Sequence, residues 1–190
     1  MACEFSGRVR DAFQNLGHDA WSCDFLPSDT PGNHIQGDIL ENLNKGWDLM
    51  IAHPPCTWLC AAMRTNAKRK DRPEIAKKFE QERDKSFSFV MSLWNSGIEK
   101  IAIENPIGYL SGNWKKPSQI IRPFLFGHPY KKDICLWLKN LPPLYPTVAL
   151  FPPLPYKTFD VWSTKRNPNG RSVKSITFPG IASAMAEQWG

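Results

Sequence analysis

The stretch that decides the fold runs from Trp47 to Cys56 and reads WDLMIAHPPC. Its apolar run ends at Ala52 and is followed directly by turn residues, a pattern typical of a strand buried on both faces. Two prolines then stop the strand and stiffen the backbone in front of Cys56. We therefore expect a buried strand over 47–52 that carries a cysteine to the edge of a sheet.

Strand and helix patterns alternate on both sides of this stretch. Apolar runs predict strands at 2–5, 20–23, 100–103 and 134–138, and helical spacing predicts helices at 8–16, 73–94 and 181–189. Residues 142–155 hold six prolines and cannot form a helix. This order predicts an α/β fold, a parallel sheet with crossover helices, in a single domain over 1–190.

Composition limits the classes of protein to which the chain can belong. Its 24 Lys and Arg against 18 Asp and Glu give a net charge of +6, and residues 64–85 alone hold nine basic and five acidic side chains. This surplus predicts a positive surface and a phosphate-bearing partner. Without an apolar run of about 18 residues or a secretory signal, we expect no membrane partner, a cytoplasmic location and five reduced cysteines.

Residues suited to ligand binding or catalysis follow each of the first four predicted strands. They are Phe5-Ser6-Gly7, Asp24, Pro54-Pro55-Cys56 and Glu104-Asn105. Ligands of an open parallel sheet bind beyond the carboxyl ends of its strands. A small residue after the first strand lets a ligand approach the backbone, and Asp24 can accept both hydroxyls of a ribose. The alternative for Asp24 alone is a strand-end turn residue.

Cys56 is the most interesting thiol of the chain. Held rigidly at the mouth of a sheet, it is a candidate nucleophile, the alternative being a small apolar residue that fills a loop. Glu104 is a candidate proton donor, or else a turn acid. Cys56 and Cys60 lack a second Cys or His pair at zinc-site spacing, so no metal site is predicted. His53 and His34 are interpreted as polar loop residues.

Taken in order along the chain, the four motifs after the predicted strands, together with Gly37-Asp38-Ile39, resemble those of the S-adenosylmethionine-dependent cytosine C5-methyltransferases. That family has a Phe-x-Gly loop, two cofactor-binding acids, a Pro-Cys nucleophile loop and a Glu-Asn pair in this order. The segment 126–132, FGHPYKK, is similar to the family's basic segment, and 178–186 to its last helix. The chain departs from the family at Val9, which stands in place of a second glycine. The resemblance implies a Rossmann-like class I methyltransferase fold, with a mostly parallel sheet and helices on both faces.

The resemblance also assigns roles to individual residues. Cys56 would add to C6 of cytosine, and Glu104 would hydrogen-bond N3 and the exocyclic amine. The cofactor S-adenosylmethionine would be bound by the two acids and by the segments around them: Phe5, Ser6, Gly7, Asp24, Asp38, Ile39 and Pro54. The substrate would be bound by Pro55, Asn105, Lys131, Lys132 and Arg171.

The chain lacks room for the recognition domain with which sequence-reading relatives bind duplex DNA. Residues 139–174 form a proline-rich basic insertion in its place, as in a compact, phage-like form of the family. The expected substrate is therefore cytosine in a deoxycytidine nucleotide, in single-stranded nucleic acid or as a base flipped from DNA. Two alternatives stay open: a catalytically silent protein that binds nucleic acid or a partner through its basic surface, and addition chemistry with another electrophile at C5.

Overall fold

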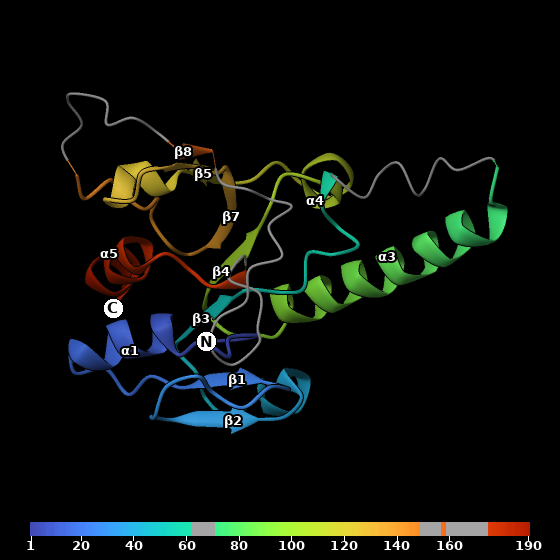
Figure 1. Ribbon diagram of the computed structural model, residues 1–190. Helices are drawn as coiled ribbons and strands as arrows, with labels where there is room; N and C mark the ends of the chain where they lie inside the picture. The colour runs from blue at the N-terminus through green and yellow to red at the C-terminus, as the bar shows by residue number, and fades with distance from the viewer. Residues whose placement is uncertain (62–70, 149–156, 159–174) are drawn as a thin grey trace. The chain divides into compact units, whose positions relative to one another are not determined.

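The computed structural model describes residues 1–61, 71–148, 157–158 and 175–190 (Figure 1). The chain divides into two compact units, each built from separate stretches of sequence. Unit 1 holds residues 1–39, 121–133 and 142–190, and unit 2 holds residues 40–120 and 134–141. The prediction of one domain over 1–190 stays a prediction.

The elements follow one another in an α/β order. They are α1 (Arg8–Asn15), β1 (Ser22–Asp24), β2 (His34–Gln36), η1 (Ile39–Asn42), β3 (Leu49–Ala52), α3 (Pro73–Trp94), β4 (Lys100–Asn105), α4 (Tyr109–Asn113), β5 (Gln119–Ile121), η3 (Pro123–Phe126), β6 (Tyr130–Lys131), β7 (Ile134–Lys139), β8 (Lys157–Thr158) and α5 (Pro179–Trp189).

The largest sheet has the strand order β3-β4-β7-β5. Strands β3 and β4 are parallel, with Ala52 opposite Ile103, and both are almost wholly buried. Between them the chain passes through α3, the crossover that a parallel pair requires. The apolar runs at 47–52 and 100–103 therefore become neighbouring strands that are largely buried, and burial is what their composition predicts.

The prediction of a mostly parallel sheet is not confirmed for this sheet, because β7 runs antiparallel to β4. The sheet is therefore mixed. The apolar run of β7 records burial, and burial does not specify the direction of a strand. Inside unit 2, the fully buried Trp137 of β7 donates its indole N–H to the carbonyl of Lys115 at 2.9 Å.

Unit 1 contains a helix pair and two small parallel sheets, β1-β2 and β6-β8. Helix α1 packs beside α5, and Figure 1 shows the two side by side. The buried residues of α1 include Val9 and Phe13, and those of α5 include the small side chains of Ala182 and Ala184. The predicted first strand, 2–5, is reduced to one parallel bridge between Ala2 and Cys23.

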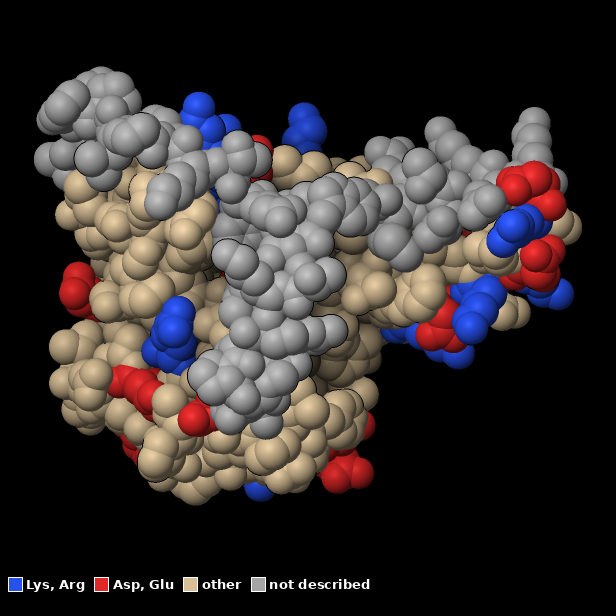
Figure 2. Space-filling model, viewed as in Figure 1, with Lys and Arg blue, Asp and Glu red and all other residues tan. Residues whose placement is uncertain are grey.

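The charges of α3 are nearly balanced in the part of the chain that the structure describes. Residues 71–85 hold five basic and five acidic side chains, so the surplus read from 64–85 comes from residues 64–70, which lie outside the described residues. Figure 2 shows blue and red atoms mingled along this helix, and Lys85 pairs with Glu82 at 2.8 Å.

Among the described helices, none combines the length and apolar character that crossing a membrane requires.

Candidate active site

The carboxyl ends of β3 and β4 bring a histidine and a glutamate together in unit 2. His53 is the first residue after β3, and Glu104 lies opposite it near the end of β4 because the strands are parallel and in register. The Nδ1 atom of His53 lies 2.8 Å from Oε2 of Glu104. Both side chains are largely buried, with 10% and 17% of their surface exposed. The pair therefore faces little solvent. A hydrogen bond to a carboxyl group is stronger in such a place than in water.

A second side-chain bond joins the same two loops one residue further on. The side-chain amide of Asn105 donates to the carbonyl of Pro54 at 3.0 Å. Because the proline carbonyl can only accept, this contact fixes which end of the amide is the nitrogen. Asn105 is 2% exposed and its amide supports the loop, and the substrate contact expected of this residue stays a prediction.

Cys56 stands in a single helical turn directly after the two prolines. Its carbonyl accepts the backbone N–H groups of Leu59 at 3.0 Å and Cys60 at 2.9 Å. Pro54 is buried, while Pro55 and Cys56 are exposed. The turn thus presents the thiol at the surface of unit 2, on a backbone restrained by prolines before it and hydrogen bonds after it.

The chain after Cys56 is joined to the chain after Glu104 by backbone contacts. Tyr109 donates its N–H to the carbonyl of Leu59 at 2.7 Å, and Ala61 donates to Ile107 at 3.1 Å. Gly108 lies where these segments meet, and a Cβ built there would be 2.0 Å from the Leu59 carbonyl oxygen. Only glycine permits this approach. The loop that carries Cys56 and the loop that follows Glu104 and Asn105 therefore form one substructure.

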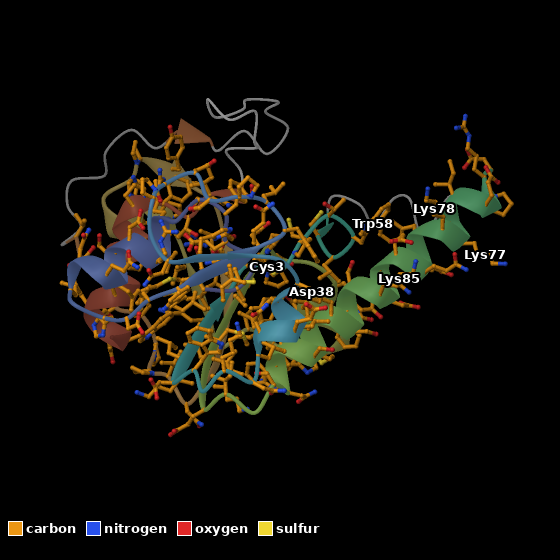
Figure 3. All side chains as sticks on the ribbon, turned by 90° about the horizontal axis from the view of Figure 1, so that it is seen from below. Cys3, Asp38, Trp58, Lys77, Lys78 and Lys85 are labelled. Carbon is orange, nitrogen blue, oxygen red and sulfur yellow. The ribbon has the colours of Figure 1, made fainter. Side chains whose placement is uncertain are left out.

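The predicted cofactor acids lie in unit 1, around Cys3. Asp24 ends β1, and Asp38 follows the neighbouring parallel strand β2 by two residues. Burial raises the pKa of the Cys3 thiol to about 12, and the carboxylates of Asp24 and Asp38 add to this rise. Figure 3 shows Cys3 beside Asp38. Two carboxylates and a neutral thiol therefore gather at the ends of two parallel strands.

The flanks of this acid pair differ in exposure. Phe25, next to Asp24, has 68% of its surface exposed, whereas Ile39, next to Asp38, is buried. The sequence interpretation gave Ile39 a cofactor contact and did not single out Phe25.

The Phe-x-Gly loop is closed by a buried carboxylate at the start of α1. Glu4 is 4% exposed, and its Oε1 accepts the hydroxyl of Ser6 at 3.0 Å and the N–H of Val9 at 2.8 Å. Its Oε2 accepts the N–H of Arg10 at 3.4 Å. Glu4 thus satisfies helix N–H groups that would otherwise be available to an anion. Phe5 and Ser6 are buried within this loop.

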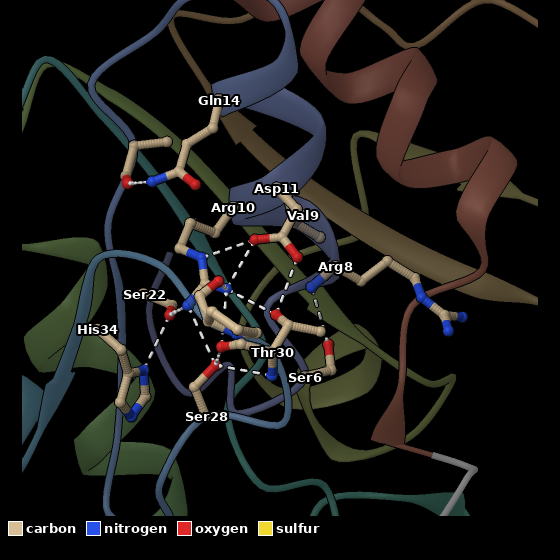
Figure 4. Close-up of polar contacts among 12 residues, drawn as sticks. Ser6, Arg8, Val9, Arg10, Asp11, Gln14, Ser22, Ser28, Thr30 and His34 are labelled. Carbon is tan, nitrogen blue, oxygen red and sulfur yellow. Dashed lines mark hydrogen bonds and ion pairs between the residues drawn. The ribbon is translucent and has the colours of Figure 1, made fainter.

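Gly7 is needed for a reason internal to the fold. It takes a left-handed conformation, with φ of 71°, and a Cβ there would lie 2.1 Å from Oγ1 of Thr30. Thr30 belongs to a loop that the wholly buried Arg10 holds in place (Figure 4). The guanidinium donates to Ser22, Ser28, Thr30 and Pro31 and pairs with Asp11.

The basic segment and the start of α5 meet in unit 1. His128 accepts the N–H of Gly180 on Nε2 at 2.9 Å, and its ring lies against Phe178, 5.2 Å between centroids. Burial lowers the pKa of His128, and the charge of Arg8 lowers it further. Lys132 Nζ lies 5.9 Å from the centroid of the Phe178 ring, and Lys131 is exposed. Arg171 and most of 139–174 lie outside the described residues.

Within unit 2 the structure brings together five of the predicted residues: Pro54, Pro55, Cys56, Glu104 and Asn105. The predicted Phe5, Ser6, Gly7, Asp24, Asp38, Ile39, Lys131 and Lys132 belong to unit 1. His53, interpreted from sequence as a polar loop residue, lies in the loop after β3, and its contact with Glu104 was not predicted. The signal was present, since His53 follows one predicted strand and Glu104 ends the next.

Among the residues that the structure describes, no three His, Cys, Asp or Glu side chains are grouped so that they could hold a metal ion. Comparisons with protein-family models, with curated proteins and with solved structures found no match.

Proposed function

We propose that this chain transfers a methyl group from S-adenosylmethionine to C5 of cytosine in a deoxycytidine nucleotide or in DNA, through covalent addition of Cys56. The observation that carries the proposal is the joined pair of loops after β3 and β4. An exposed cysteine lies on the restrained turn that follows β3, and a largely buried glutamate lies near the end of the neighbouring parallel strand β4. The side-chain contacts of His53 and Asn105 join the two segments.

The described residues of unit 1 fit the adenosyl part of this cofactor. Asp24 and Asp38 lie at the carboxyl ends of adjacent parallel strands, where one carboxylate suits ribose hydroxyls and the other the adenine amine. Glu4 occupies the first N–H groups of α1 with a buried carboxylate, which disfavours the pyrophosphate of a dinucleotide there. S-Adenosylmethionine is a nucleoside without phosphate, so it agrees with this loop.

Each reacting side chain supplies one part of the chemistry. The Cys56 sulfur forms a bond to C6, which turns the ring into an enamine with a nucleophilic C5. Glu104, as the acid, donates a hydrogen bond to N3 and stabilises the charge that develops there during addition. When bound, S-adenosylmethionine supplies the electrophilic methyl group. C5 would take this methyl group while S-adenosylhomocysteine leaves as the neutral thioether. Water would then accept the C5 proton, and the electron pair of that C–H bond would expel Cys56 as a thiolate and restore the aromatic ring.

The test is transfer of label from methyl-labelled S-adenosylmethionine to a panel of dCMP, dCTP, single-stranded DNA and duplex DNA. We expect label in at least one of them, with the product mass of a methyl group in place of one hydrogen. Cys56→Ser should abolish transfer and leave the affinity for S-adenosylmethionine unchanged in calorimetry. The matched control is Cys60→Ser, in the same turn, which should remain active.

Three results would contradict the proposal. A cofactor that gives no binding heat would favour a silent protein that binds nucleic acid or a partner instead. A cofactor that binds without transferring label to any substrate would remove the methyl-transfer activity. Full activity of Cys56→Ser would remove Cys56 from the mechanism.

A further inference from the structure

We propose that His53 selects cytosine over uracil by fixing the position of the proton on Glu104. This inference rests on the proposed function, because it concerns the base that the same site accepts. The observation behind it is the 2.8 Å contact between His53 Nδ1 and Glu104 Oε2, between side chains that are only 10% and 17% exposed.

The contact determines which carboxyl oxygen can carry the proton. In a neutral carboxyl group the carbonyl oxygen is the better acceptor and the hydroxyl oxygen is the donor. An N–H on His53 Nδ1 therefore makes Oε2 the carbonyl oxygen and places the acid proton of Glu104 on Oε1. The register of β3 and β4 holds this arrangement, since His53 and Glu104 directly follow the paired residues Ala52 and Ile103.

A carboxyl group fixed in this way matches cytosine. The N3 atom of cytosine is an acceptor and fits the O–H on Oε1, while the exocyclic amine is a donor and fits a second lone pair on Oε2. Uracil has the opposite pattern, a donor at N3 and an acceptor at O4, so both contacts would be mismatched. A mismatched pair of hydrogen bonds costs about 1–3 kcal/mol, which corresponds to about 5- to 150-fold in affinity.

His53 would thus be a positioning and specificity residue that acts through Glu104. Without the Nδ1 donor the carboxyl group could turn over or lose its proton, and an ionised Glu104 would accept the N3–H of uracil. Asparagine can place an amide N–H near the position of Nδ1, whereas leucine fills a similar volume without a donor. His53→Asn and His53→Leu therefore separate the donor from the packing.

The experiment measures binding of dCMP and dUMP, and of matched single strands with one cytosine or one uracil, by calorimetry. We expect the unaltered protein to prefer cytosine by at least about fivefold, His53→Asn to keep most of that preference, and His53→Leu to lose it. The unfolding midpoints of both variants in urea report any general loss of structure. Labelled imidazole NMR should find Nδ1 of His53 protonated.

Several outcomes would overturn the inference. It is wrong if His53→Leu keeps the preference for cytosine, if both variants lose it equally, or if Nδ1 carries no proton. It is also wrong if the unaltered protein binds neither base or does not distinguish them. Because these readouts are binding and tautomer, they stand apart from methyl transfer, and the label assay decides separately whether the proposed function holds.

Discussion

Replacing the buried Arg10 by methionine should strongly destabilise unit 1. The guanidinium has no exposed surface, and it donates to four residues and pairs with Asp11 at 2.6 Å. Methionine fills most of the same volume without any donor. The change therefore removes the polar contacts with little change in packing, and it leaves Ser22, Thr30 and their neighbours with unsatisfied groups.

The magnitude follows from burial. Asp11 is 35% exposed, so water partly solvates the charge that remains, whereas the hydroxyl of Ser22 stays buried. Each polar group left unsatisfied out of water costs about 1–3 kcal/mol, so the lost contacts together should cost about 3–5 kcal/mol. For a chain of this length each kcal/mol corresponds to about 2–4 °C, so the midpoint of thermal unfolding should fall by about 6–20 °C. Arg10→Lys should also be destabilised, since one ammonium cannot reach all the acceptors that the planar guanidinium reaches.

The assay is urea unfolding followed by tryptophan fluorescence and far-ultraviolet circular dichroism. The matched control is Arg122→Met, which removes one pair with Asp133 at 2.6 Å from a side chain that is 51% exposed. An exposed pair contributes about 0–1 kcal/mol, so this control should unfold near the unaltered protein. If Arg10→Met were within about 1 kcal/mol of the unaltered protein, the network would be no stronger than a surface pair and the reasoning would be refuted.

Two further predictions concern titratable side chains. At pH 8 a Cys3 thiol with a pKa of about 12 is ionised in about one molecule in 10,000. Limiting iodoacetamide should therefore alkylate the exposed Cys56 long before Cys3, and peptide mass mapping would measure both rates. Equal rates of alkylation would contradict the raised pKa of Cys3. Because the folded pKa of His128 is lowered, its contribution is present above its ordinary pKa of about 6.5 and is lost as pH falls. The unaltered protein should therefore lose more unfolding free energy between about pH 7 and 5 than His128→Gln, which keeps a neutral acceptor, and equal losses in urea titrations would argue against this role.

Strands β3 and β4 and the two loops after them could be predicted from the sequence, and other parts could not. The apolar runs of β3 and β4 indicate burial, and the turn residues behind them locate Cys56 and Glu104 at strand ends. Strand β2 was missed because it is polar and only partly buried. The strand expected over 2–5 does not form, because Cys3 has a φ of 56° that interrupts the extended backbone. A cysteine at this position does not predict a positive φ.

The candidate site was predictable residue by residue but not as a set of contacts. The bond between His53 and Glu104 joins residues 51 positions apart, and a local pattern carries no record of such a partner. The same holds for Glu4, which resembles an ordinary strand residue until the fold places it beneath the start of α1. The predicted strand ends indicate which side chains lie in the candidate site. Which of these side chains contact one another depends on strand register and on tertiary packing.

The packing of α1 beside α5 has a consequence for the order of folding. These helices lie near opposite ends of the chain, so unit 1 cannot complete its helix pair until α5 has left the ribosome. Unit 2 has all of its strands once β7 has been made, well before α5. Contacts between such distant segments slow folding, because the long loop must close before they can form. During synthesis the loops that carry Cys56 and Glu104 are therefore expected to assemble first, while α1 waits for its partner.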